Sequence, residues 1–504
     1  MAEYKHGAYG EQQIVGTRVA AECQSAVVLV GTAPVQNLLP DSDGNWPVNK
    51  PILVRDIKEA KKYFSYSDDW TKYTLCEAMH VFLEINGIGP LVLVNVLDPK
   101  TTHKASAVTT KSLTPANGRI IIADAEDIIL NSIVVKTQDS PPVTKVKGTD
   151  YTTFYNQAKK TITIQELTAG ALGTSALTVE YYLVTPNTVS DTDIIGATDN
   201  LGTNSGLYAI KSVYNECGVI PAILMAPGWS ELPSVHAAMA SVSLKINGHW
   251  DAWMFTDIPL VDNSTPITLT TAKIWKDANG YTKKNETVSF PMALGTDGKK
   301  YHISVLRCAN FMSLLADNDG IPYHTASNTP VSNIANLWMG TGAVNKVFDD
   351  QIINENLNQN GICSIAFVGG RWVIWGAHAA EYDQDNGDVI NVSETNYMML
   401  FYLSNNFQAR RPHDVDQPLS ANDVLSIVAE EQARLDALVK IGALTYGKAT
   451  IDTSKVAKSD MYNGDFLFIF DITTTPIAKS LTVMVNWVED GFETYFAALE
   501  SGGD

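Results

Sequence analysis

One stretch carries a residue type and spacing that hydrolysis would need. The segment PGWSEL places Ser230 between an apolar run and Pro233, as in the nucleophile elbow of a hydrolase. The elbow requires a second glycine where Leu232 stands, its helix should begin at the serine, and the sequence assigns no histidine as a base. An ordinary connection from strand to helix is therefore favoured, and an α/β hydrolase with Ser230 as nucleophile is the alternative function.

Two glycine-containing stretches match phosphate-binding motifs only in part. The run SAVVLVGTAP contains Gly31 alone, whereas a dinucleotide site needs G-x-G-x-x-G leading into a helix. The run GALTYGKA fits G-x-x-x-x-G-K, but Ala449 stands where magnesium needs a hydroxyl, and the run follows a helix instead of a strand. These features predict a core strand and a turn, with no catalytic or cofactor-binding residues and no cofactor.

Composition excludes several further classes. The five cysteines stand singly and the nine histidines do not cluster with them, which predicts neither a metal site nor a disulfide framework. A formal net charge of -19 repels phosphate backbones and argues against direct nucleic-acid binding. No apolar run reaches the ~18 residues of a membrane helix, and the start MAEYKHGAYG lacks the apolar core of a signal peptide. We expect no membrane insertion and assembly in a cytoplasm.

The elements that would position any site follow an α/β order. Residues 21–100 and 191–410 alternate buried-strand runs with helical patterns, which predicts a mixed α/β (α+β) core in two parts. The run GICSIAFVGGRWVIWG predicts a hairpin turning at Gly369 and Gly370. The whole chain is expected to be multidomain.

Residues 101–190 differ in amino-acid composition from the core segments on either side. Thr, Val and Ile dominate, and turn clusters such as DSPP separate short candidate strands. This spacing predicts an inserted β-sandwich domain. Its candidate strands are Arg119–Ile122, Ile128–Val135, Thr161–Ile164 and Leu177–Val184.

The C-terminal part predicts a small α/β domain, residues 411–488. Ser420 and Asp423 form a capping-box-like start for a helix that Gly442 ends. The strands Asp465–Ile472 and Ser480–Val488 are expected to follow.

Residues 1–20 and 489–504 are expected to be extended N- and C-terminal arms, because neither can hold a core of its own. An unpaired strand must find a sheet edge, and donating it to a neighbouring subunit is β-augmentation.

The sequence resembles the tail sheath proteins of contractile-tailed bacteriophages, including the P2-like (myophage) ones. The resemblance lies in segments that occur in the family's order and cover most of the chain except residues 101–190. These segments are YKHGAYGEQQIVGTRV, SAVVLVGTAP, VIPAILMAPGWSELPSVHAAM, DAWMFTDIP, GGRWVIWGAH and NGDFLFIFDITTTPIAKSLTVMV.

The resemblance implies a structural protein of the virion tail and no enzyme. Such subunits polymerise as stacked hexameric rings around an inner tube and contract to drive the tube through a target cell envelope. The implied partners are other sheath subunits, the inner tail tube protein, the baseplate and the tail terminator.

The arms and one helix supply the candidate site residues. The tube-facing candidates, carried over from the family's inner domain, are Asp423, Glu430, Glu431 and Asp436. The candidates for inter-subunit arm contacts are Tyr4, Tyr9, Ile14, Gly16, Arg18, Val485, Trp487, Phe492 and Tyr495.

Overall fold

The computed structural model describes residues 25–342, 349–383, 390–451 and 463–502. The chain forms two compact units, Met1–Val424 and Leu425–Asp504, which are described separately below. The predicted N-terminal arm lies outside the described residues. No helix in the described ranges is long and apolar enough to cross a membrane.

An eight-stranded sheet forms the centre of the first unit. Six neighbouring strands are parallel, and an antiparallel strand closes each edge. The order across the sheet is β19 (Arg371–Trp375), β18 (Ile362–Val368), β14 (Glu286–Ser289), β11 (Trp253–Asp257), β10 (Ile220–Met225), β1 (Ser25–Gly31), β3 (Leu91–Asn95) and β2 (Ile52–Val54). All five residues of β3 and six of seven in β1 are buried, as expected for strands covered on both faces.

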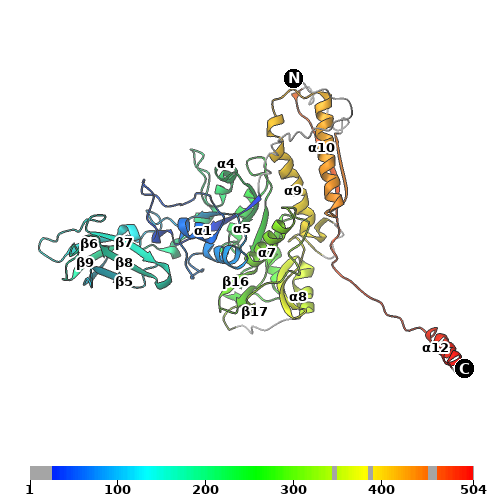
Figure 1. Cartoon of the computed structure of the whole chain (residues 1–504), viewed down its shortest axis with the longest axis horizontal. Helices are drawn as coiled ribbons and strands as arrows, with labels where there is room; N and C mark the ends of the chain where they lie inside the picture. Colours follow the sequence, from blue (N-terminus) through cyan, green and yellow to red (C-terminus); the bar gives the residue numbers. More distant parts are fainter. Residues whose placement is uncertain (1–24, 343–348, 384–389, 452–462, 503–504) are drawn as a thin grey trace, which may run out of the picture. The chain divides into compact units, whose positions relative to one another are not determined.

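Helices lie around this sheet and contribute to its core (Figure 1). They are α1 (Ile57–Phe64), α2 (Leu75–Ala78), α3 (Asp191–Ile195), α4 (Val213–Cys217), α5 (Pro233–Val242), α6 (Ala272–Ala278), α7 (Ile303–Asp317), α8 (Asp350–Asn356) and α9 (Glu394–Arg410). A three-stranded sheet of β16 (Lys300–His302), β15 (Met292–Gly295) and β17 (Ile334–Trp338) and the short pair β12 (Val261–Asp262) and β13 (Thr265–Pro266) complete the core elements. The predicted α/β class and the Gly369–Gly370 hairpin are confirmed, since both glycines have positive φ and join β18 to β19.

Between β3 and α3 the chain forms two three-stranded antiparallel sheets with a hydrophobic cluster of their own (Figure 1, cyan). One sheet is β4 (Thr109–Leu113), β9 (Leu177–Tyr181) and β6 (Val134–Thr137). The other is β5 (Arg119–Ile122), β8 (Thr161–Glu166) and β7 (Tyr151–Asn156). We call residues 104–184 the insert. Its cluster, which includes Ile120, Val135, Ile164 and Val179, is separate from the cluster of the main sheet.

The helix α10 (Ala421–Lys440) begins at the boundary of the two units, and the predicted cap is confirmed. The Asp423 amide donates to Ser420 Oγ at 3.3 Å, and the Ser420 amide donates to Asp423 Oδ2 at 2.8 Å. In the second unit α10 is followed by the antiparallel hairpin β20 (Leu444–Ile451) and β21 (Phe468–Thr474). The helix holds the hairpin through Gln432, whose side chain accepts from the Ala449 amide at 2.8 Å and donates to the Gly447 carbonyl at 3.1 Å.

The C-terminal end differs from the predicted strand and extended arm. Residues 475–488 are in neither helix nor strand, and α12 (Gly491–Ser501) follows them. The prediction of a strand at Ser480–Val488 was therefore wrong, because alternating apolar residues form a strand only where an edge is available to pair with. The prediction of an extended arm overlooked the three- and four-residue spacing of Phe492, Tyr495 and Phe496, which is typical of a helix.

Candidate functional site

The crevice at the carboxyl ends of β1 and β10 is where doubly wound sheets bind ligands, because the connections diverge there. In this protein Thr74 fills it. The Thr32 amide donates to Thr74 Oγ1 at 3.3 Å, and the Thr74 amide donates to Thr32 Oγ1 at 3.0 Å. A Cβ at Gly31 would collide with that same Thr74 hydroxyl. The Ala33 amide is bonded to Asn95 Oδ1 at 2.9 Å. The amides that would meet a phosphate are already used, and the predicted core strand is confirmed.

Ser230 lies near this crevice but is not arranged as a nucleophile. Its side chain is fully buried, and its hydroxyl accepts from the Asp257 amide at 3.3 Å. Its carbonyl accepts from the Tyr281 hydroxyl at 2.8 Å. In the described part of the chain no histidine bonds to the Ser230 hydroxyl, so the pairing of nucleophile with base that a hydrolase requires is not formed.

A group of charged and polar residues lies beside the crevice, and we call it the crevice cluster: Glu77, Glu231, Asp257, His302 and Ser304. His302 directly precedes α7, and its Nδ1 lies 2.6 Å from Glu77 Oε2, while its Nε2 lies 3.3 Å from Glu231 Oε1. Burial alone would lower the pKa of His302, but the two carboxylates hold it well above its usual value. An imidazolium between two carboxylates is thus held inside the domain.

Asp257, at the carboxyl end of β11, completes the cluster. Its carboxylate accepts from the Ser304 amide at 3.1 Å and from the Ser304 hydroxyl. Burial raises the pKa of Asp257 to about 7, against the opposing effects of His302 and Ser304. The cluster joins α2, β11, the loop before α5 and α7, so its geometry supports a brace between core elements.

The GALTYGKA stretch is a helix end and a strand. Gly442 has φ +82° directly after α10, as a helix-ending glycine should. Lys448 lies within β20, opposite Asp471 of β21. A Cβ on Gly447 would lie 2.9 Å from Leu435 Cβ, so this glycine allows β20 to pack against α10. The predicted absence of a phosphate loop agrees with this packing.

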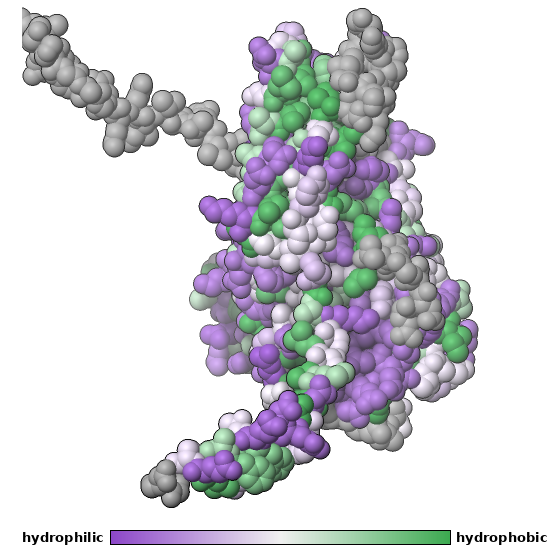
Figure 2. All heavy atoms as spheres, turned by 90° about the vertical axis from the view of Figure 1, so that its right-hand side faces the viewer, coloured by the Kyte–Doolittle hydropathy of each residue, from purple (hydrophilic) through white to green (hydrophobic). Residues whose placement is uncertain are grey.

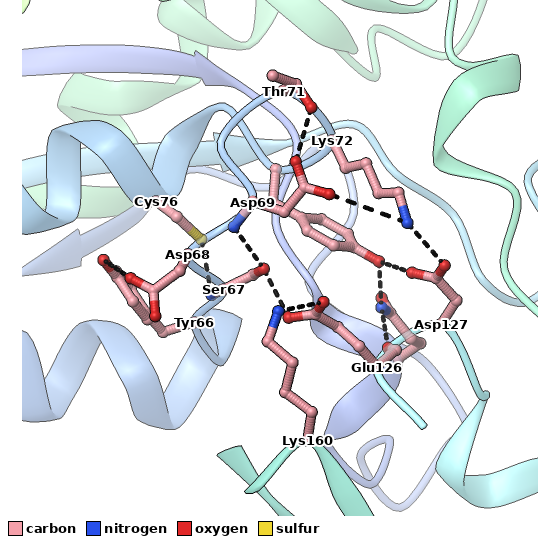
Figure 3. Close-up of polar contacts among 12 residues, drawn as sticks. Tyr66, Ser67, Asp68, Asp69, Thr71, Lys72, Cys76, Glu126, Asp127 and Lys160 are labelled. Atoms are coloured by element: carbon pink, nitrogen blue, oxygen red, sulfur yellow. Dashed lines mark hydrogen bonds and ion pairs between the residues drawn. The ribbon is translucent and has the colours of Figure 1, made fainter. Parts of the chain in front are cut away.

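The insert is joined to the main sheet domain by a polar network that we call the insert junction (Figure 3). Asp127 of the insert accepts from Lys72 Nζ at 2.9 Å and from the Tyr73 hydroxyl at 2.8 Å. Glu126 accepts from the Ser67 hydroxyl at 2.6 Å, and its other carboxylate oxygen accepts from Lys160 Nζ at 2.9 Å.

A fourth contact at the insert junction is the side-chain amide of Gln36, which donates to the Glu126 carbonyl at 2.9 Å. Lys72 and Asp127 each keep about a third of their side chains exposed, at 31% and 32%. Water can therefore reach the Lys72–Asp127 pair, whereas Glu126 is only 13% exposed and its partners Gln36 and Ser67 are buried.

Comparison with known proteins gives one full-length relative. A tail sheath protein of Burkholderia phage BcepMu is 25% identical over 509 positions, covering 95% of this chain and 96% of that protein. This chain is a relative of a phage tail sheath protein. The matched span leaves too few residues outside it to omit residues 101–190, so it runs across this segment. No protein-family model matches the sequence.

Solved structures of contractile sheaths share the fold. The helical sheath of the anti-feeding prophage in its contracted state has a TM-score of 0.53 at 12% identity, covering 97% of this chain and 100% of that one. The sheath complex of an extracellular contractile injection system (PVC) in its contracted state has a TM-score of 0.53 at 10% identity, covering 97% and 99%.

The four tube-facing candidates all lie on α10, but their side chains differ in exposure. Asp423, Glu430 and Asp436 are exposed, whereas Glu431 is buried at 2% and lies 3.9 Å from Arg434. The apolar side of the helix includes Val424, Ile427, Leu435 and Leu438, all buried as the periodicity predicts.

The tail sheath candidates for arm contacts fall into two groups. Tyr4, Tyr9, Ile14, Gly16 and Arg18 lie outside the described residues. Val485, Trp487, Phe492 and Tyr495 are all exposed, at 85%, 74%, 52% and 59%.

Sequence reasoning missed the crevice cluster and the insert junction. Glu77 and His302 are 225 residues apart, and Lys72 and Asp127 are 55 apart. No local spacing marks either pair, since each forms only when the sheet brings loops together. The adjacent acidic pair Glu126 and Asp127, placed just before a candidate strand, was the one available signal.

Proposed function

We propose that this chain is the structural subunit of a contractile tail sheath. The observation that carries the proposal is the full-length similarity to a phage tail sheath protein, supported by a fold shared with solved contractile sheaths. In this function the chain polymerises as stacked hexameric rings around an inner tube. Contraction then drives the tube through a target envelope with no cofactor or nucleotide.

The proposed partners follow from this role. Other copies of the chain form the rings and stack helically, the inner tail tube protein lies inside them, and the baseplate and tail terminator contact the two ends. The particle location is the virion tail, after assembly in the cytoplasm of a bacterial host. The proposed function involves no catalysis, and the buried setting of Ser230 argues against the hydrolase alternative.

Electron microscopy of the purified chain, alone and with tube protein, tests the proposal. Striated tubes in negative stain would support it. A chain that stays monomeric at high concentration under both conditions would refute it.

We place the tube-facing surface on the exposed acidic side of α10. Reversing the charges at Glu430 and Asp436 to lysine should weaken co-assembly with tube protein, because electrostatic complementarity mainly sets association. The matched control reverses Glu216, an exposed acid in α4. Unchanged co-sedimentation of the α10 variant would remove this helix from consideration.

Strand donation between copies is the proposed role of the arms. The hairpin of β20 and β21 is a two-stranded sheet, so each strand has an outer edge, and one extended strand of a neighbour can pair with it. Residues 14–24, IVGTRVAAECQ, would then be the tether between the arm and β1, with Gly16 as its bend.

Lengthening this tether beside Gly16 should preserve assembly but stop contraction, since each added residue supplies up to ~3.5 Å of slack. Images taken before and after a contraction trigger would show this. Full contraction of the lengthened chain would exclude the tether role.

A further inference from the structure

Large hydrophobic side chains are exposed in the C-terminal segment that contains α12, where Figure 2 shows them along one side, and also in the insert. In the insert, Ile121 of β5 is 61% exposed and Phe154 of β7 is 48% exposed. Both lie opposite Thr163 of β8 in the strand register, and Thr163 is buried between them. This row therefore places an aromatic ring and an aliphatic side chain together on one face of a sheet.

The strand register defines the rest of this face, because side chains two residues apart along a strand point to the same side. We call it the Phe154 face. Its members are Arg119 and Ile121 of β5, Thr161, Thr163 and Gln165 of β8, and Thr152, Phe154 and Asn156 of β7. The alternate residues, such as Ile120 and Ile164, are buried in the hydrophobic cluster of the insert. The Phe154 face is thus the outer side of this sheet.

Every neighbour of Phe154 on this face carries an uncharged hydrogen-bonding group. These neighbours are Thr163 directly opposite, Thr152 and Asn156 along β7, and Thr161 and Gln165 on the diagonals of β8. Hydroxyl and side-chain amide groups both donate and accept hydrogen bonds. An aromatic ring surrounded by such groups suits a ligand ring that is apolar on its face and carries hydroxyls around its rim. A sugar ring has this form.

Two side-chain amides keep hydrogen-bonding capacity for such a ligand. Within the described chain, Asn156 uses its side-chain oxygen, which accepts from the Lys159 amide at 3.1 Å. Gln165 uses its side-chain nitrogen, which donates to the Gly118 carbonyl at 3.2 Å. Asn156 therefore offers donors to a ligand and Gln165 offers an acceptor. A sugar hydroxyl, which both donates and accepts, can use either.

The outer face of the other sheet of the insert is different. On that face Lys136 pairs with Glu180 at 2.7 Å, on either side of the position of Thr178. Its outward-facing residues in the three strands include no aromatic side chain. The arrangement around Phe154 is therefore a property of one face and not of the insert as a whole.

Charge favours an uncharged ligand. Arg119 is the one charged member of the Phe154 face. The insert contains eight basic and seven acidic residues and is almost neutral, whereas the whole chain carries a formal net charge of -19. The acidic remainder of the chain repels an anionic polymer, and the Phe154 face offers no acidic group to a cationic one. A neutral polymer rich in hydroxyls meets neither obstacle.

We propose that the Phe154 face binds a neutral polysaccharide, with one sugar ring stacked on Phe154 and its hydroxyls bonded to Asn156 and Gln165. Two strand spacings separate β5 from β7, so Ile121 extends the apolar floor to roughly 10 Å from Phe154. The face can thus hold more than one ring of a sugar chain. This binding activity goes beyond the proposed function. On a sheath it would give each copy one weak attachment to a cell-surface polysaccharide, and many copies would add up to a strong one.

A glycan array tests the proposal with the purified full chain. The array carries neutral oligosaccharides of glucose, galactose, mannose and N-acetylglucosamine, together with sulfated and sialylated ones. Binding to at least one neutral oligosaccharide is expected, and titration calorimetry with the tightest-bound one then gives Kd. Binding to none of the neutral oligosaccharides, or to charged ones alone, would overturn the inference. The measurement uses unassembled chain, so its outcome is independent of whether the chain forms tubes.

Removing the aromatic ring should have the largest effect on this Kd. Phe154→Ala should weaken binding by about tenfold or more, because aromatic anchors dominate binding energies. The matched control is Phe367→Ala, which removes an aromatic side chain that is 45% exposed in β18 and should leave Kd unchanged. Equal effects of the two variants would overturn the inference. Loss of tube assembly by Phe154→Ala with unchanged sugar binding would also overturn it, since the face would then contact a second copy.

A milder pair of variants separates hydrogen bonding from folding. Thr152→Val removes a hydroxyl from the Phe154 face while keeping the side-chain shape, and it should weaken binding by about two- to tenfold, the range of one hydrogen bond. Its control is Thr178→Val on the outer face of the other sheet, with no expected change. Binding to the natural chain should vary less than about twofold as salt rises, because screening acts on charges. A steep fall with salt would assign the binding to Arg119 and overturn the inference.

Discussion

The crevice cluster and the insert junction both join loops through charged side chains, but they differ in exposure. In the crevice cluster Glu77 and His302 keep 2% and 14% of their side chains exposed, whereas Lys72 and Asp127 at the insert junction keep about a third. Buried charges that lose a partner are very costly, while exposed pairs contribute little. The Glu77–His302 pair is therefore expected to contribute more to stability than the Lys72–Asp127 pair, although Glu126 at the insert junction is also largely buried, at 13%.

Removing His302 should have the largest effect. His302→Ala leaves the Glu77 carboxylate buried without its partner, and we expect a loss of about 3–5 kcal/mol in the free energy of unfolding. Denaturant titration measures it. His80→Ala is the matched control, because His80 pairs with a partly exposed Glu84 and should lose under about 1 kcal/mol. Equal losses of unfolding free energy in the two variants would contradict the expectation that the buried pair contributes more than the exposed one.

Asp257 predicts a pH dependence with a defined sign. Its folded pKa of about 7 lies above the unfolded value of 3.8, so the unfolded chain binds fewer protons between these pH values. The contribution of Asp257 to stability is present below pH 3.8 and is lost as pH rises to about 7. Asp257→Asn should therefore gain stability relative to the natural chain over this range, by roughly 4 kcal/mol at most.

Asp68 supplies the opposite case for the same titration. The hydrogen bond from Lys299 lowers the pKa of Asp68, so its contribution is present above the unfolded pKa of 3.8 and is lost as pH falls through the lower folded value. Asp68→Asn should show a small effect of the opposite sign, because this carboxylate is 61% exposed. For each variant, the difference in unfolding free energy from the natural chain is plotted against pH. Slopes of the same sign for the two variants would contradict the opposite pKa shifts of Asp257 and Asp68.

Removing the insert should have a smaller effect on the main sheet domain. Replacing residues 104–183 with a short Gly/Ser bridge deletes a separate hydrophobic cluster and keeps Val184 of the main-sheet cluster, but it removes Ile129, which also belongs to that cluster. We expect a folded chain that loses about 1.5–3 kcal/mol and still assembles into tubes. Calorimetry and microscopy measure the two outcomes. Loss of folding would show that the insert is part of the core.

The smallest effect is expected at the insert junction itself. A double-mutant cycle of Lys72→Met and Asp127→Asn should give a coupling energy under about 1 kcal/mol, because the pair is solvent-accessible. The coupling should fall further as salt rises. A coupling that is large and independent of salt would mean that the insert junction behaves as a buried cluster.

Patterns along the chain predicted the elements better than the contacts between them. The buried run of β1, the Gly369–Gly370 turn and the cap at Ser420 were all recognisable, because each depends on neighbouring residues. The sequence also predicted that Gly31 belongs to a core strand and not to a phosphate site. The structural cause, the Thr74 hydroxyl beside Gly31, comes from another element. The crevice cluster was out of reach, because Glu77 and His302 meet only through the sheet.

The end of the chain shows why a pattern can mislead. Residues 480–488 alternate apolar and polar side chains, yet they form no strand in a single copy, because a strand needs a partner. Their apolar residues, such as Val485 at 85%, are highly exposed. The alternation of residue types is visible in the sequence, but whether a pairing edge is available is not.

The segment 475–490, which is in neither helix nor strand, also has a kinetic consequence under the proposed function. Once any first contact holds two copies together, this segment confines α12 to a small volume around the neighbouring chain. A short flexible linker gives an effective concentration in the millimolar range. A contact of α12 that is too weak to join two free copies would therefore still close between copies that another contact already holds.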